Sequence, residues 1–85
     1  MIEHVPSENC FRTPEGAVLS YTVKDGRYHF DHTVVPPELR GQGVAGKLAT
    51  AAFEHARENG WSIVPDCSFI DVFLKRHPEF AELVD

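Results

Sequence analysis

The stretch PPELRGQGVAGKLATAAF, residues 36–53, places several glycines where an expected helix begins. Gly41 and Gly43 lack a Cβ atom, so their backbone can adopt unusual conformations and come close to another group. The first N–H groups of a helix have no intrahelical partner and lie at the positive end of the helix dipole. With the charge of Arg40 beside them, these groups predict a site for a phosphate. A glycine-containing loop without a ligand is the alternative, and neither a GxGxxG nor a Walker lysine motif is present.

Two side chains outside this stretch are candidates for chemistry. Cys67 directly precedes an expected helix, whose positive end favours a thiolate, although the neighbouring carboxylate of Asp66 opposes this effect. The alternative for Cys67 is a small buried side chain that packs under the helix. His32 is a candidate general base, because imidazole exchanges a proton near neutral pH. The alternative for His32 is a core histidine bonded to the backbone.

The other histidines and the second cysteine show no spacing typical of a metal site, so we predict no metal. His77 is expected at the C-terminus of a helix, where a histidine complements the dipole. Lys47 is expected in solvent, with an approach to a phosphate as the alternative.

A hairpin must position His32. Asp25-Gly26 lies between the β-rich segments 17–23 and 28–35, and this dipeptide predicts a two-residue turn. Such a turn fixes the register, so we expect Tyr21 opposite Phe30, Leu19 opposite His32 and Ala17 opposite Val34. The apolar members of these pairs indicate the core face, and His32 is therefore expected to point toward it. A short strand in residues 7–13 is expected before the hairpin.

A helix must position the glycine-rich stretch. From Val44 the apolar residues recur with the period of an amphipathic helix of about four turns. Gly60 is its natural C′ residue. Residues 61–64 then form a short strand, and a strand–helix–strand crossover makes its two strands parallel, with a right-handed connection.

A second helix must position Cys67. Ser68 and Asp71 resemble a capping box, which starts this helix, and Pro78 ends it. The predicted order is β-β-β-α-β-α. The expected fold class is therefore α/β (α+β), with a mainly antiparallel sheet and one parallel strand–helix–strand crossover.

Length and composition favour one small domain, residues 1–85, with 42% hydrophobic and 25% charged residues. No stretch approaches the ~20 apolar residues of a membrane span, and the N-terminus lacks the pattern of a signal peptide. The net charge of −5 argues against a general nucleic-acid binder. Two cysteines without CxxC spacing favour a reduced cytoplasmic protein, with one disulfide left open.

The segment Arg40-Gly41-Gln42-Gly43-Val44-Ala45 resembles the (Q/R)xxGx(G/A) motif of the GCN5-related N-acetyltransferases (GNAT superfamily). It lies where that superfamily has the motif, between a core strand and the long helix. HTVVPPELRGQGVAGKL, PDCSF and RHPEF, in this order, resemble the small members that consist of little more than the acetyl-CoA-binding core. The resemblance covers roughly residues 10–84 and implies a GNAT-like fold of minimal size.

The resemblance also implies where acetyl-CoA would bind. The segment 33–35 would splay from the strand 61–64, and the pantetheine arm would lie in the gap and pair with the backbone of Val34 and Val35. Cys67 occupies the place of a cysteine to which catalysis is ascribed in the small members. The chain lacks most of the segments that wrap an acceptor in larger members. The backbone amides implied to hold the pyrophosphate are those of Arg40, Gly41, Gln42, Gly43, Val44 and Ala45.

Three functions are compatible with these residues. The first is acetyl transfer from acetyl-CoA to an amine, the second is a non-catalytic module that binds CoA or acetyl-CoA, and the third is an interaction domain without a ligand. The intact glycine motif argues against the third, whereas Cys67 and His32 do not form a clear acid–base pair. We expect acetyl-CoA and an unidentified amine or protein acceptor as partners, no nucleic acid or membrane, and a monomer or weak dimer.

Overall fold

The computed structural model describes residues 1–85 and confirms the predicted order of elements, with one further strand at the N-terminus. That strand, β1, is not among the predicted elements. The strands are β1 (Glu3–Val5), β2 (Cys10–Arg12), β3 (Val18–Lys24), β4 (Arg27–Val34) and β5 (Ser62–Val64). The helices are α1 (Val44–Asn59) and α2 (Ser68–Arg76), with 3₁₀ turns at Pro6–Glu8, Pro37–Leu39 and Pro78–Leu83.

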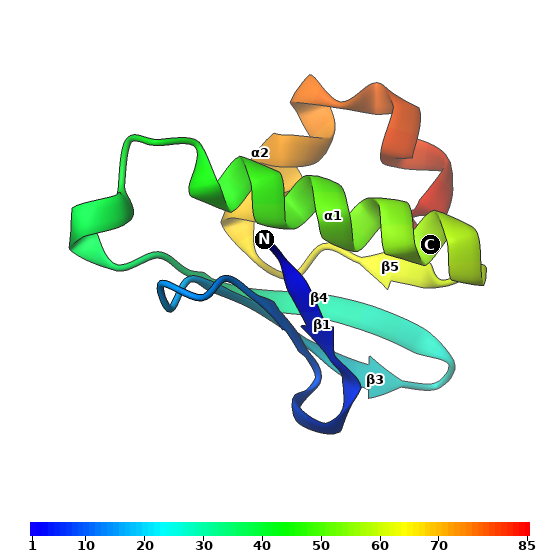
Figure 1. Ribbon diagram of the computed structural model, residues 1–85. Helices are drawn as coiled ribbons and strands as arrows, with labels where there is room; N and C mark the ends of the chain where they lie inside the picture. Colours follow the sequence, from blue (N-terminus) through cyan, green and yellow to red (C-terminus); the bar gives the residue numbers. More distant parts are fainter.

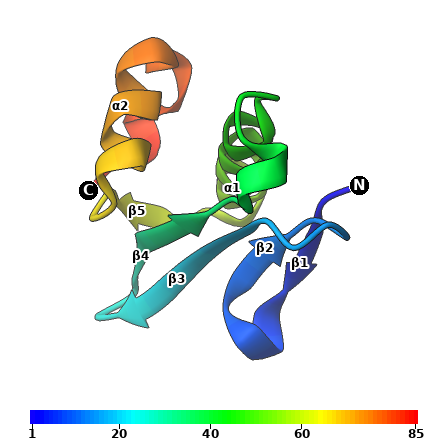
Figure 2. The ribbon, with the colours of Figure 1, turned by 90° about the vertical axis from the view of Figure 1, so that its left-hand side faces the viewer.

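The strands form one sheet in the order β1-β2-β3-β4-β5. All neighbours are antiparallel except β4 and β5, which are parallel, as the crossover through α1 requires. Both helices lie on one face of the sheet, and the other face is bare (Figures 1 and 2). This arrangement confirms the predicted fold class. None of the helices has the length and apolar character needed to cross a membrane.

The hairpin turn forms as predicted. Asp25 and Gly26 both have positive φ, 54° and 76°, which is the conformation of a tight type I′ turn. Lys24 pairs with Arg27 on either side of it. Tyr21 also pairs with Phe30, so the expected register is correct in the half of the hairpin next to the turn.

The register beyond Tyr21 differs from the prediction because β4 contains a bulge. Ser20 pairs with His32 and Leu19 with Thr33, which leaves Asp31 as the extra residue. The predicted pairs Leu19–His32 and Ala17–Val34 are therefore wrong. His32 points to the bare face of the sheet with its side chain 75% exposed, and Thr33 takes the inward position.

Helix α1 closes the core over the sheet. It begins at Val44 and ends at Gly60, whose φ of 69° is the expected left-handed C-terminal conformation. The ring of Phe53 lies 5.2 Å from that of Phe30 and 5.7 Å from that of Phe73, so α1 contacts both β4 and α2. The α1 side chains buried on this face are Leu48, Ala49, Ala52, Phe53 and Ala56.

Helix α2 does not start with the predicted capping box. Its N-cap is Cys67, and Ser68 is already the first helical residue, so the Ser68 hydroxyl is not placed to cap the first turn. The Asp71 N–H donates instead to the Cys67 carbonyl at 3.1 Å. The predicted end at Pro78 is confirmed, since α2 stops at Arg76 and a 3₁₀ turn follows.

Candidate acetyl-CoA-binding site

The parallel strands β4 and β5 separate after a short paired stretch. Their pairing covers residues 27–29 of β4 and 62–64 of β5, and the Cys67 N–H then donates to the Phe30 carbonyl at 3.0 Å. Beyond Phe30, β4 has no strand beside it on this edge. The gap lies past the carboxyl end of β5, on the side where open α/β sheets collect ligands.

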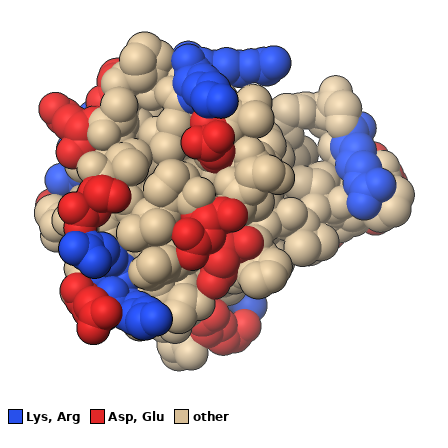
Figure 3. Space-filling view, turned by 180° about the vertical axis from the view of Figure 1, so that it is seen from behind, with Lys and Arg blue, Asp and Glu red and all other residues tan.

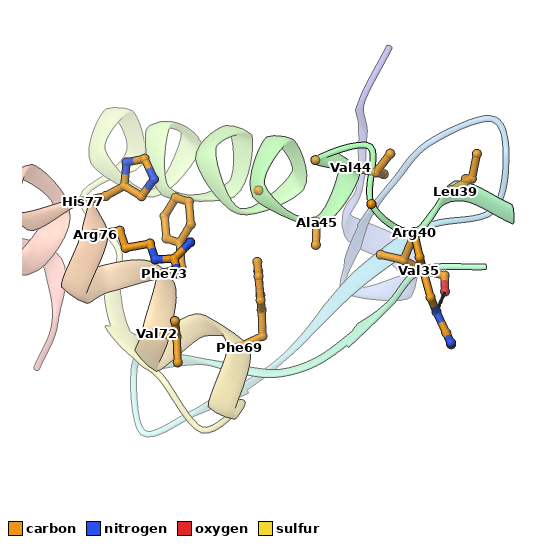
Figure 4. Close-up of a pocket in the computed structure, with 13 residues that line it drawn as sticks. Val35, Leu39, Arg40, Val44, Ala45, Phe69, Val72, Phe73, Arg76 and His77 are labelled. Atoms are coloured by element: carbon orange, nitrogen blue, oxygen red, sulfur yellow. Dashed lines mark hydrogen bonds between the residues drawn. The ribbon is translucent and has the colours of Figure 1, made fainter. Parts of the chain in front are cut away.

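A cleft of about 390 Å³ lies beside this gap, between the α1 N-terminus and α2 (Figure 4). Side chains of α2, most of them apolar, form one wall, and the glycine-rich loop before α1 forms the other. Its lining residues are Val35, Leu39, Arg40, Gly41, Gly43, Val44, Ala45, Gly46, Phe69, Val72, Phe73, Arg76 and His77. The structure thus brings most of the predicted glycine motif to one cleft.

The N-terminus of α1 presents backbone donors without a side-chain cap. Gly43 is the N-cap residue with φ 75°, and a glycine has no side chain to bond the first N–H groups. The first helical bond is from the Lys47 N–H to the Gly43 carbonyl, at 3.1 Å. The N–H groups of residues 44–46 are therefore left for a ligand, and no acidic residue in the first turn opposes an anion.

Gly46 is a cleft residue that the sequence reasoning missed. It lies in the first turn of α1, and glycine in a helix is less favourable than alanine, by up to about 1 kcal/mol in the interior. A Cβ atom at this position would meet nothing within 4 Å, so packing within the chain does not require the missing side chain. The missing side chain therefore leaves room for a ligand to approach the backbone at the start of α1, at some cost in helix stability.

Arg40 is tied to the end of β4. Its Nε donates to the Val35 carbonyl at 3.1 Å, and its side chain runs away from α2 (Figure 4). The Val35 carbonyl, one of the groups expected to pair with pantetheine, therefore already has a partner within the chain. Gln42 is also used locally, since its Nε2 donates to the Glu38 carbonyl at 3.1 Å.

The α2 wall of the cleft was also missed. Its residues follow the i, i+3, i+4 and i+7 spacing of one helix face, a signal that the sequence contains but that equally describes core packing. His77 is the C-cap of α2 as expected, and its ring stacks on Phe73 with centroids 4.2 Å apart. It lines the cleft as well. The wall residues are Phe69, Val72, Phe73 and Arg76.

Cys67 does not itself line the cleft, but it contacts a β4 residue beside it. Its Sγ is 3.8 Å from Thr33 Oγ1, and Thr33 lines a side hollow of about 370 Å³. This hollow shares four lining residues with the main cleft, including Phe69 and Ala45. Both cysteines are free thiols, and Cys10 is buried, which raises the pKa of its thiol.

His32 lies outside the cleft. Its Nδ1 is 3.2 Å from Asp31 Oδ1, and Asp31 also accepts a hydrogen bond from Thr22 at 2.7 Å. All three residues belong to the bare face of the sheet. Val34 points to the same face, with 59% exposure, but it also borders the side hollow.

Positive charge near the cleft is local. Arg40 and Arg76 line the cleft, and Lys47 lies with His77 in a shallow neighbouring hollow. Seen from behind, the molecule carries basic and acidic side chains interspersed, with no continuous basic surface (Figure 3). An anionic ligand is therefore attracted by the helix N-terminus and a few side chains.

Comparison with known proteins identifies the family. Residues 10–83 match the sequence family described as GCN5-related N-acetyl-transferase. This chain belongs to the GCN5-related N-acetyltransferases. The match includes the glycine motif, Cys67 and all of α2.

A solved structure supports the same assignment for the fold of this N-acetyltransferase family member. The NMR solution structure of a GCN5-like, proposed N-acetyltransferase from Staphylococcus aureus is similar, with a TM-score of 0.75 and 34% sequence identity. The similarity covers 100% of this chain and 87% of the other. The resemblance inferred from the sequence motifs is thus confirmed.

Proposed function

We propose that this GCN5-related N-acetyltransferase binds acetyl-CoA in the cleft between α1 and α2. The observation that carries the proposal is the α1 N-terminus, which opens into the cleft with a glycine N-cap and unpaired N–H groups. The pyrophosphate lies on the backbone of residues 40–46. Family membership supports acetyl-CoA as the anionic ligand.

The pantetheine arm runs from the glycine loop along the free edge of β4. It pairs with the backbone of Val34 and Val35, where β5 has ended and no strand competes. Because Arg40 occupies the Val35 carbonyl, the arm either pairs with other polar groups of this edge or displaces that bond. The thioester then reaches the side hollow beside Thr33 and Cys67.

The reaction is acetyl transfer to an amine. In the covalent route, the Cys67 thiolate attacks the thioester carbonyl carbon, and the CoA sulfur leaves and takes up the proton that the thiol lost. The amine then attacks the acetyl-cysteine, which releases the amide and the free thiol. His32 serves as general base only for an acceptor that arrives over the bare face, where Asp31 holds Nδ1 and Nε2 is free.

The second candidate is a module that binds acetyl-CoA without turnover. It is favoured by the position of His32, whose exposed side chain lines neither the cleft nor the side hollow. CoA release measured with a panel of amines separates the two functions. Release above the hydrolysis background supports the enzyme, and none with any amine supports the module.

Replacement of Gly46 by leucine tests the binding site. The new side chain fills the room that the glycine leaves, so calorimetry should show acetyl-CoA affinity reduced by about tenfold or more, equivalent to about 1.4 kcal/mol. The melting temperature should rise, because leucine is a better helix former than glycine by about 0.8 kcal/mol. Both effects in one variant exclude unfolding as the cause of lost binding.

Glu58→Leu is the matched control, since it introduces the same side chain at an exposed position near the other end of α1. Its acetyl-CoA affinity should equal that of the wild type. If Gly46→Leu binds acetyl-CoA as tightly as the wild type, the pyrophosphate does not lie at the α1 N-terminus and the proposed site is wrong.

A further inference from the structure

The bulge in β4 decides which side chain faces the gap. A regular hairpin would place His32 inward opposite Leu19, but the extra residue Asp31 places Thr33 there. Leu19 is fully buried, so its partner Thr33 is held against the core side of the sheet. The hydroxyl of Thr33 therefore lies on the cleft side of β4.

Cys67 meets this hydroxyl from the opposite side of the gap. Its backbone is fixed twice, because its N–H donates to the Phe30 carbonyl at 3.0 Å and its carbonyl accepts from the Asp71 N–H at 3.1 Å. The thiol itself has a single hydrogen-bond partner, Thr33 Oγ1 at 3.8 Å. A β-branched threonine has few χ1 rotamers, so this partner is also held in place.

We propose that Thr33 is the positioning residue of Cys67: its hydroxyl orients the thiol toward the side hollow and donates a hydrogen bond to the thiolate when it attacks the acetyl thioester. A threonine hydroxyl has one donor and two acceptor sites, so it accepts from the thiol and, after rotation, donates to the thiolate. A hydrogen bond to a charged sulfur is stronger than one between neutral groups.

The surroundings match this role. Thr33 lines the side hollow together with Phe69 and Ala45, which leaves space beside the hydroxyl for a small acyl group. The step that it assists is Cys67–SH plus acetyl-S-CoA giving Cys67–S-acetyl plus HS-CoA, so one thioester forms as the other breaks. The inference rests on the proposed function for this step, but the contact with Cys67 exists without it.

The test compares Thr33→Val, which removes the hydroxyl at nearly constant shape, with Thr33→Ser, which keeps it. Thr22→Val is the control, because its hydroxyl lies on the bare face and bonds Asp31. Two rates are measured by peptide mass spectrometry: alkylation of Cys67 by iodoacetamide without acetyl-CoA, and acetylation of Cys67 by acetyl-CoA without an acceptor.

Thr33→Val should slow both rates by about tenfold, as expected for loss of a hydrogen bond to a charged group. Thr33→Ser should restore most of both rates, and Thr22→Val should match the wild type. The proposal is overturned if Thr33→Val alkylates at the wild-type rate, or if Thr33→Ser is as slow as Thr33→Val.

Two further measurements keep the outcomes separate. If Thr33→Val melts at a lower temperature, the pair Thr33→Ser and Thr33→Ala, which differ only in the hydroxyl, decides the question by the same criteria. Alkylation requires no acetyl-CoA, so it tests Thr33 independently of the cofactor. A wild-type protein that fails to bind acetyl-CoA in calorimetry contradicts the proposed function instead.

Discussion

Arg40 carries a positive charge at the site and is also hydrogen-bonded to the backbone of the chain. Arg40 is among the residues that line both the cleft and the side hollow, and its Nε donates to the Val35 carbonyl. The protein carries a net charge of −5, so a polyanionic cofactor approaches against long-range repulsion and needs local positive charge. Arg40 therefore offers both a positive charge for the ligand and a hydrogen bond within the chain, and mutagenesis can separate the two effects.

We predict that Arg40→Ala weakens acetyl-CoA binding by about fivefold at low salt and by less at high salt, because salt screens exposed charges. Arg40→Lys, which keeps the charge without the planar fork, should retain most of the affinity. Calorimetry at several salt concentrations measures this. An equal loss at every salt concentration, together with a lower melting temperature, would show that the bond to Val35 is what matters.

Strand β4 owes its shape to the bulge at Asp31. Bulges bend a strand and increase its twist, and this one lies where β4 leaves β5. The pairs on either side, Tyr21 with Phe30 and Ser20 with His32, become consecutive if Asp31 is removed. A shortened strand therefore keeps its inward and outward side chains but loses the bend.

We predict that deletion of Asp31 gives a folded protein with about tenfold lower affinity for acetyl-CoA. Circular dichroism should show native secondary structure, and calorimetry should show the loss of binding. Deletion of Thr22, which lies outside the bulge, is the control and should prevent folding because it inverts the side-chain alternation of half of β3. Undiminished binding by the Asp31 deletion would mean that the bend does not shape the site.

The molecule carries an aromatic cluster near the N-terminal end of β5, away from the cleft. His4 bonds the Tyr21 hydroxyl at 2.7 Å, and its ring lies 4.4 Å from both the Phe11 and the His55 rings. Trp61 completes the cluster and contacts the His55 ring at 4.9 Å. These contacts join β1, β2, β3 and α1 into one packing unit.

Burial and the neighbouring His55 lower the pKa of His4 below its ordinary value. The unfolded chain therefore binds a proton at His4 more readily than the folded one. The stability that comes from packing an uncharged His4 is therefore fully present above the ordinary imidazole pKa. It is lost as the pH falls through the lower pKa that His4 has in the folded protein, so the free energy of unfolding decreases.

We predict that the melting temperature decreases as the pH is lowered from about 7 to about 5. Thermal unfolding can be measured by the fluorescence of Trp61. His4→Gln should flatten this dependence at the cost of some stability at neutral pH. The exposed His32→Gln is the control and should keep the wild-type dependence. Equal pH profiles of the wild type and His4→Gln would exclude His4 as the origin.

Local signals in the sequence determined much of the fold. Asp25-Gly26 specified the turn, because its chemistry favours the positive φ that both residues adopt. The apolar period from Val44 and the glycine at position 60 specified α1 to its last residue. Together with the strand after it, this helix imposed the parallel crossover, and the glycine motif at its start located the candidate site.

The tertiary structure decided which side chains share that site. The bulge at Asp31 depends on how two strands fit over the core, so alternation within β4 could not reveal that Thr33, and not His32, faces the gap. The apolar face of α2 has the same sequence pattern whether it packs in a core or lines a cleft. Only the placement of α2 opposite the start of α1 makes Phe69 a cleft residue. Arg40 likewise donates a hydrogen bond to the Val35 carbonyl because the folded loop lies close to the end of β4. No local sequence pattern predicts this contact.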